Sequence, residues 1–339
     1  MNKLLGTVAL LAIGTLTAIP AIAQDVPMPW AYGFPAPPPP NFTPPPPNPP
    51  VAQDNVVKIK VEGSTLEFTR AQVANRFGPA DWFPTDHGPM PEIVAKGREA
   101  ANIFACSLCH YPNGHGRPEN ANVIGLPYDY FVQQLRDFKN GARKTSDPRQ
   151  GNTGVMAGFA SKMTDAEIEA AAKYFTSIKY TPNYIKVVES DTAPKVRTQA
   201  GMWLVLEGEQ AGQEPIGNRI IETPISSHET EYNRNSRSGF TAYVPKGSVK
   251  KGENLATKGD TDSGGKITAC VACHGMDLRG IGPVPPLAGR SPRYIARQLY
   301  DMKKGNRNGA WTAMMAPVVS GMGEADILAA SAYAASLTP

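Results

Sequence analysis

The sequence has few cysteines, few aromatic residues and no marked excess of one charge. Its 339 residues include 4 Cys, and aromatic residues make up 8% of the chain. Lys and Arg number 34 against 30 Asp and Glu, a formal net charge of +4 at pH 7. This small and scattered excess argues against a nucleic-acid-binding protein, because such proteins gather basic residues to neutralise phosphates. Hydrophobic residues still make up 41% of the chain, which excludes a wholly disordered protein.

Long apolar runs are absent beyond Ala23. Residues 1–23 have a basic start at Lys3, an apolar run from Leu4 to Ala18 and small residues before Gln24. This arrangement is typical of a secretory signal peptide, whose removal lowers the formal charge to +3. No later stretch reaches the roughly 18 apolar residues that span a bilayer. We therefore expect a soluble periplasmic protein, for which peripheral association is the one form of membrane contact left open.

Two C-x-x-C-H motifs contain all the cysteines of the chain: Cys106, Cys109 and His110, then Cys270, Cys273 and His274. Thiols at this spacing match the two vinyl groups of haem, and the adjacent His lies under the iron as its proximal ligand. A redox dithiol does not need the His, and a four-Cys zinc site would have to join two Cys pairs from distant parts of the chain. Because two copies follow a signal peptide, we expect two covalently bound haem c groups.

The chain repeats itself at the offset that relates Cys106 to Cys270, which is 164. Segment 130–143 recurs as segment 294–307, with Tyr, Gln, Leu, Asp, Lys, Gly and Arg in register. Apolar residues at positions i, i+4 and i+7 give each segment one hydrophobic helical face, and Gly141 and Gly305 end the helices. The repeat therefore predicts a duplicated helical haem domain.

The sixth iron ligand is expected between that helix and the last helix of each domain. The last helices are predicted to begin at a capped Thr164 and near Gly323, an offset of 159. This offset places Met156 on Met315. A Met thioether opposite His favours reduced iron and raises its potential. We expect Met156 and Met315 to be the ligands, with Met314 as the rival of Met315.

These features together resemble the tandem dihaem class I cytochromes c of the c4 type. The resemblance rests on the paired C-x-x-C-H motifs, the Y-x-x-x-Q-L-x-D-x-K-x-G-x-R helix and the Met before a capped last helix. It implies two small all-α haem domains with His/Met iron. Family members also orient the proximal His with a Pro carbonyl. Pro285 matches that position in the second copy, whereas the first copy has Ala121, whose carbonyl or a neighbouring one could serve.

The rest of the chain departs from this family. More than half of the positions in segment 27–50 are Pro, from which we expect a stiff polyproline tether without core contacts. Residues 55–68 predict a hairpin before a short helix over residues 69–77. Residues 181–250 form a segment longer than a simple linker between domains, and its apolar stretches predict extended segments packed across both domains. His115, which follows the first motif, is expected to be solvated.

The predicted fold is mainly α, with two tandem cytochrome c domains, an extended or irregular connecting segment and a Pro-rich N-terminal tether. The expected parts are a signal peptide at 1–23, the tether at 24–53, a hairpin and helix at 54–92, a first haem domain at 93–180, the connecting segment at 181–250 and a second haem domain at 251–339.

The predicted function is the relay of single electrons in the periplasm. The donor would be a dehydrogenase or a quinol-oxidising complex, and the acceptor a terminal oxidase or another redox protein. Six-coordinate iron has no open site for a substrate, whereas electron exchange needs none, so we do not expect an enzyme. The alternatives are a cytochrome subunit of a periplasmic dehydrogenase and, less favoured, a dihaem peroxidase, which needs an iron that opens to peroxide.

Overall fold

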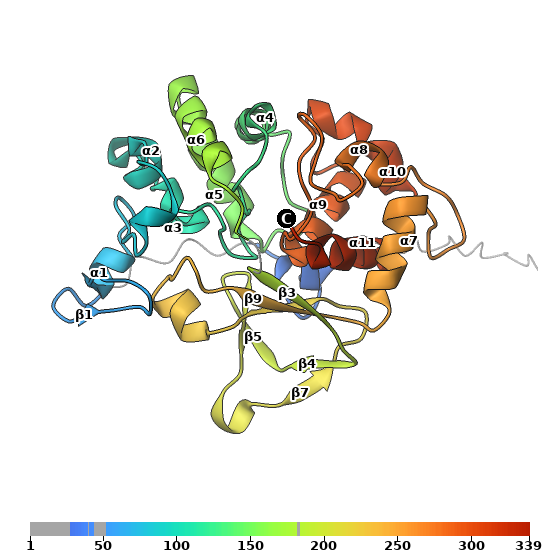
Figure 1. Cartoon of the computed structure of the whole chain (residues 1–339), viewed down its shortest axis with the longest axis horizontal. Coiled ribbons are helices and arrows are strands. Elements are labelled where there is room, and N and C mark those ends of the chain that lie inside the picture. The colour runs from blue at the N-terminus through green and yellow to red at the C-terminus, as the bar shows by residue number, and fades with distance from the viewer. Residues whose placement is uncertain (1–27, 40, 44–51, 182–183) are drawn as a thin grey trace, which may run out of the picture.

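The computed structural model describes residues 28–39, 41–43, 52–181 and 184–339. The predicted signal peptide and much of the Pro-rich segment lie outside these residues. Two helical domains stand side by side above a layer of short strands that both of them contact (Figure 1). No helix in the described ranges is long and apolar enough to cross a membrane.

The first helical domain contains α2 (Glu92–Ala95), η3 (Glu99–Ala101), α3 (Cys106–His110), α4 (Tyr128–Lys139), α5 (Gly151–Ala160) and α6 (Asp165–Ser177). The predicted cap of the last helix is confirmed. The Thr164 hydroxyl accepts from the N–H of Glu167, and the Glu167 carboxylate accepts from the N–H of Thr164. α4 stops before Gly141, whose φ of 72° favours glycine. α4 and α6 bury Phe131, Leu135 and Phe175 in one apolar cluster.

The second helical domain contains α7 (Ser248–Lys258), α8 (Val271–His274), α9 (Pro292–Lys303), η6 (Ala310–Met314), α10 (Ala316–Ser320) and α11 (Glu324–Ser336). α11 begins after Gly323, as predicted, and the Asp326 carboxylate accepts from the Gly323 N–H. α7 and α11 approach closely at Gly252, where an added Cβ would lie 2.0 Å from the carbonyl oxygen of Ala329. Only glycine fits at this crossing.

The residues that recur in the repeat join the two domains. Two buried arginines each donate hydrogen bonds to a tyrosine hydroxyl and a glutamine side chain of the other domain, at 2.7–2.9 Å. Arg143 of the first domain donates to Tyr294 and Gln298. Arg307 of the second domain donates to Tyr130 and Gln134. The offset of 164 relates Arg143 to Arg307, Tyr130 to Tyr294 and Gln134 to Gln298. The contact is therefore reciprocal, which makes the two domains related by an approximate two-fold axis.

The connecting segment folds into short strands, which confirms the extended alternative of the prediction. One sheet has the order β3 (Ile185–Glu189), β9 (Phe240–Val244), β8 (Ile221–Pro224), with β3 parallel to β9 and β8 antiparallel to it. Two further antiparallel pairs are β4 (Thr192–Pro194) with β7 (Gln213–Pro215), and β5 (Val196–Gln199) with β6 (Met202–Val205). The segment also contains η4 (Gly208–Gln210) and η5 (His228–Tyr232).

This segment packs against both domains, as the sequence predicted. Trp203 lies in one apolar cluster with Leu255 and Tyr300 of the second domain. Tyr184 donates its hydroxyl proton to the carbonyl of Gly116 in the first domain at 2.8 Å. The connecting segment therefore forms a floor under the pair of helical domains (Figure 1).

The predicted hairpin is confirmed, with β1 (Lys58–Ile59) antiparallel to β2 (Phe68–Thr69). The helix after it is shorter than predicted, because α1 spans Arg70–Val73 only. The Asn75 side chain accepts from the N–H of Phe77, a local bond that competes with helix continuation. η2 (Pro84–Asp86) follows, and a small core holds Val73, Trp82 and Phe83.

The start of the Pro-rich segment belongs to the core, which makes the prediction of a tether without core contacts wrong for this part. Met28, Trp30 and Tyr32, around η1 (Pro29–Tyr32), are at most 5% exposed. The Tyr32 hydroxyl donates to the carboxylate of Asp301 in α9 at 2.6 Å. Pro content suggested polyproline structure, but large apolar side chains alternate with the first prolines and can be buried.

Candidate haem sites

The first C-x-x-C-H motif itself forms α3, whose His110 is buried. Nδ1 of His110 lies 2.8 Å from the carbonyl oxygen of Ala121, so this nitrogen donates and Nε2 is left for a metal. Burial lowers the pKa of His110, which keeps the imidazole in the neutral form that binds metals. The sequence did not decide which backbone carbonyl orients His110 in the first copy, and the structure identifies it as that of Ala121.

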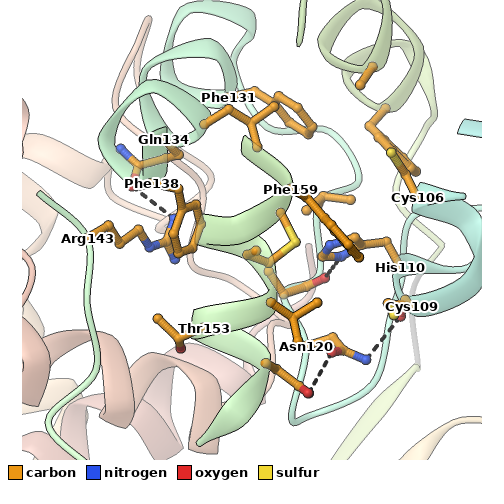
Figure 2. Close-up of a pocket in the computed structure, with 18 of the residues that line it drawn as sticks. Cys106, Cys109, His110, Asn120, Phe131, Gln134, Phe138, Arg143, Thr153 and Phe159 are labelled. Atoms are coloured by element: carbon orange, nitrogen blue, oxygen red, sulfur yellow. Dashed lines mark hydrogen bonds between the residues drawn. The ribbon is translucent and has the colours of Figure 1, made fainter. Parts of the chain in front are cut away.

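A cavity opens beside α3 in the first domain (Figure 2). Figure 2 shows Cys106, Cys109 and His110 on one side of it, with Phe138 and Arg143 across from them. Its wall also contains Met156 of α5 and the apolar side chains of Phe131, Leu135, Phe159 and Phe175. The empty space is about 1280 Å³, including the part open to solvent. The sequence predicted Cys106, Cys109, His110 and Met156 as site residues, and the tertiary structure brings them to one cavity.

The second domain completes the wall of this cavity. α9 contributes Tyr294, Arg297, Gln298 and Asp301, which sequence reasoning did not assign to the first site. Arg297 and Arg143 are both buried, and among the described residues neither lies within 4.0 Å of a carboxylate. A buried guanidinium without a counter-ion is costly, so an anionic group in the cavity would stabilise it.

This set of groups fits haem c. The two thiols match the vinyl groups, the imidazole and the thioether are ligands for haem iron, and the buried guanidinium groups match the propionates. The wall facing them is apolar, as the macrocycle requires. The wall therefore offers a suitable group for each part of the haem.

The second motif repeats the arrangement of the first. Cys270 precedes α8, and His274 is buried with its Nδ1 2.8 Å from the carbonyl oxygen of Pro285, the residue that the sequence singled out. Burial also lowers the pKa of His274. In both domains a backbone carbonyl fixes the ring of the motif's His.

The thiols do not have the character of a redox dithiol. Burial raises the pKa of Cys106 to about 12 and that of Cys270 to about 11, whereas reactive cysteines have lowered pKa values. The described residues contain no group of three or more His, Cys, Asp or Glu side chains that could hold a metal ion. The structure therefore supports neither the dithiol nor the four-Cys zinc site.

The methionines of the second domain differ in burial. Met315 is half-buried and packs against an apolar cluster, whereas Met314 is 67% exposed. Met163 and Met322, at the starts of the last helices, are buried in the core. Met156 and Met315 stay predictions as iron ligands.

The two motifs differ in what covers them. The connecting segment covers the loop after His110, because the Tyr111 hydroxyl donates to the carbonyl of Thr230 and the Asn113 amide to that of Ser236. In the second domain, Cys273 is exposed, and the loop after His274 leaves Met276 77% exposed and Ile281 58% exposed. The second motif therefore lies at the surface and the first does not.

His115 is buried, so its predicted solvation is wrong. It is 3% exposed, and its ring stacks on that of Tyr184 with 4.1 Å between centroids. Burial lowers its pKa to about 3, so the ring is neutral at physiological pH. The connecting segment, which is distant in sequence, covers this loop.

Comparison with known proteins gives the following matches. The cytochrome c family model matches residues 94–179 and 249–338. Cytochrome c4 of Pseudomonas aeruginosa is 35% identical over 237 residues, covering 69% of this chain and 84% of its own. A thiosulfate dehydrogenase electron acceptor of Thiomonas intermedia is 27% identical over 236 residues, covering 68% and 78%. The solved thiosulfate dehydrogenase of Marichromatium purpuratum has a TM-score of 0.46 at 23% identity; the match covers 72% of this chain and 38% of that one.

Proposed function

This chain belongs to the cytochrome c family as a dihaem, cytochrome c4-like protein that relays electrons, and we propose that it does so in the periplasm. Two covalently bound haem c groups supply the one-electron chemistry. The proposed donor is a dehydrogenase or a quinol-oxidising complex, and the proposed acceptor is a terminal oxidase or another redox protein. The protein's own contribution is to hold the haems, shield them from water and set their potentials.

The observation that carries this proposal is that each C-x-x-C-H motif holds a neutral His whose ring a backbone carbonyl orients. In our proposal, Cys106 and Cys109 attach the first haem, Cys270 and Cys273 attach the second, and the His after each pair ligates iron through Nε2. Replacing both Cys of one motif by Ala should lower the mass of the mature protein by one haem, about 0.6 kDa. An unchanged mass in either variant would contradict the assignment for that motif.

The proposed sixth ligands are Met156 and Met315. Replacing either by His should keep both haems low-spin and lower the potential of one, because the more basic imidazole favours ferric iron. The absorbance band of Met-ligated ferric haem should fall by about half, one haem of two. The half-burial of Met315 and the exposure of Met314 support this choice. Loss of the band in Met314→His and not in Met315→His would reverse it.

The proposal also separates a carrier from an enzyme. With two protein ligands on each iron, the reduced protein should bind carbon monoxide poorly, show negligible peroxidase turnover and exchange electrons rapidly with small mediators. A high-spin iron at neutral pH together with rapid peroxide reduction would favour the dihaem peroxidase instead.

A second candidate function is that of an electron acceptor for a particular periplasmic dehydrogenase. It is favoured by the likeness to electron acceptors of thiosulfate dehydrogenase in Thiomonas intermedia and Stutzerimonas stutzeri. Stopped-flow reduction of the oxidised protein by a purified thiosulfate dehydrogenase, with thiosulfate present, would test it. Reduction no faster than without the enzyme would leave the general relay as the function.

A further inference from the structure

The equivalent helices α4 and α9 differ in charge at one position that faces the other domain. Arg297 of α9 corresponds to Gln133 of α4 at the offset of 164. Arg297 is 3% exposed and lies in the wall of the first-domain cavity, together with His110 and Met156. The approximate two-fold relation makes the neutral Gln133 its counterpart toward the second domain.

Arg297 is held in place by neutral groups. Its guanidinium donates to the carbonyl of Ala31 at 3.0 Å and to that of Pro118 at 3.2 Å, and it lies 5.2 Å from the ring centre of Tyr294. No carboxylate of the described residues lies within 4.0 Å of it, and a guanidinium does not lose its proton in proteins. Arg297 therefore forms no ion pair with the protein, although Asp301, one turn further along α9 in the same wall, is close enough to interact with its charge.

Two other charged groups of the wall, Glu119 and Lys144, are neutralised or exposed. Glu119 also lies in the wall, but its carboxylate is 2.6 Å from Nε of the partly buried Arg117. Lys144 lies in the wall but is exposed, so solvent and salt screen its charge. Neither group offsets Arg297 at close range.

The remaining charged groups occur in both domains. Arg143 corresponds to Arg307, and each donates to the Tyr and Gln of the other domain. Asp301 corresponds to Asp137, and both are buried. Each pair places a charge of the same sign at the same position of the repeat, so Arg297 is the buried charge of the first site's wall that the repeat does not match.

We propose that Arg297 makes the haem of the first domain the higher-potential haem of the two, so that an electron entering the protein settles there. A buried positive charge near the haem, including one that neutralises a propionate, disfavours ferric iron relative to a neutral Gln, because ferric iron carries one positive charge more than ferrous iron. The connecting segment also covers the first motif and shields it from solvent. This burial strengthens the effect of the charge on the potential of the first haem, because electrostatic interactions are stronger away from water. The inference rests on the proposed relay and specifies the direction of electron flow within it.

The test is a spectroelectrochemical titration of the full-length, two-haem protein with small mediators. Wild type should show two one-electron waves. Arg297→Gln, which copies Gln133, should shift the reduction equilibrium of the upper wave about tenfold, or about 59 mV, toward lower potential. Gln133→Arg should shift the lower wave upward. The lower wave of Arg297→Gln should change less than about twofold.

Arg297→Lys separates charge from structure. It keeps the charge but loses the paired hydrogen bonds of the guanidinium, so its upper wave should stay near that of wild type even if its melting temperature falls. A shift of the lower wave in Arg297→Gln, or of neither wave in a folded two-haem protein, would overturn the inference. If Arg297→Gln does not fold, an unmoved lower wave in Gln133→Arg overturns it. The titration needs no partner protein, so failure of the proposed relay with a physiological partner would be a separate result.

Discussion

Replacing Tyr32 by Phe tests whether the N-terminal segment is part of the fold. Its hydroxyl donates to the buried carboxylate of Asp301 at 2.6 Å, and its ring packs edge-on against that of Tyr300 with 6.5 Å between centroids. Phe keeps the ring in place and removes only the hydroxyl. Asp301 keeps the N–H of Ser146 at 2.8 Å as its other donor. The variant therefore isolates one hydrogen bond that joins residues 269 positions apart.

The expected loss of stability follows from the type of bond. A hydrogen bond to a charged group contributes about 1.5–3 kcal/mol, and a buried acceptor that loses it is not rehydrated. We expect the free energy of unfolding to fall by about 2 kcal/mol. With a urea m-value of about 3 kcal/mol/M for a protein of this size, the unfolding midpoint should fall by about 0.7 M.

The assay is urea unfolding of the haem-loaded protein, followed by far-ultraviolet circular dichroism. Tyr232→Phe is the matched control, because this tyrosine is 41% exposed, and it should stay within about 0.5 kcal/mol of wild type. Asp301→Asn and the double variant complete a cycle that should show a coupling energy of about 1 kcal/mol or more. A midpoint for Tyr32→Phe equal to that of the control would refute the assignment of this segment to the core.

Three further substitutions follow from the structure. Burial raises the pKa of Glu222 to about 7 from 4.5, so its contribution to stability is present below pH 4.5 and is lost as the pH rises toward 7. Glu222→Gln should remove that loss of stability, on the order of 3 kcal/mol, and flatten the dependence of melting temperature on pH between 4.5 and 7. An unchanged slope would show that another group causes the pH dependence. Arg143→Ala and Arg307→Ala each remove the hydrogen bonds to a Tyr and a Gln of the other domain, so each should lower the free energy of unfolding by about 2–4 kcal/mol in chemical denaturation, and widely different losses would contradict the two-fold relation. Gly252→Ala should cost about 1–3 kcal/mol by overpacking the crossing of α7 and α11, and an unchanged melting temperature would show that the crossing can open.

Sequence alone determined the features that depend on local spacing. The C-x-x-C-H motifs, the cap at Thr164 and the glycines that end α4 and α9 each act within a few residues, so their signals are complete in the chain. The offset of 164 revealed the duplication, because the two copies retain the same residues in register. These signals were sufficient to identify two haem domains and to name the residues expected to hold the haems.

Tertiary structure decided which distant segments cover which site. Burial of His115 under residues near Tyr184, and of Tyr32 against α9, depends on contacts between parts of the chain far apart in sequence, which no local pattern records. The sequence showed that Arg297 and Gln133 break the repeat, but only packing placed Arg297 in the wall of the other domain's cavity. Electrostatic effects depend on distance and burial in space, so the consequence of that difference could not be predicted before the domains were assembled.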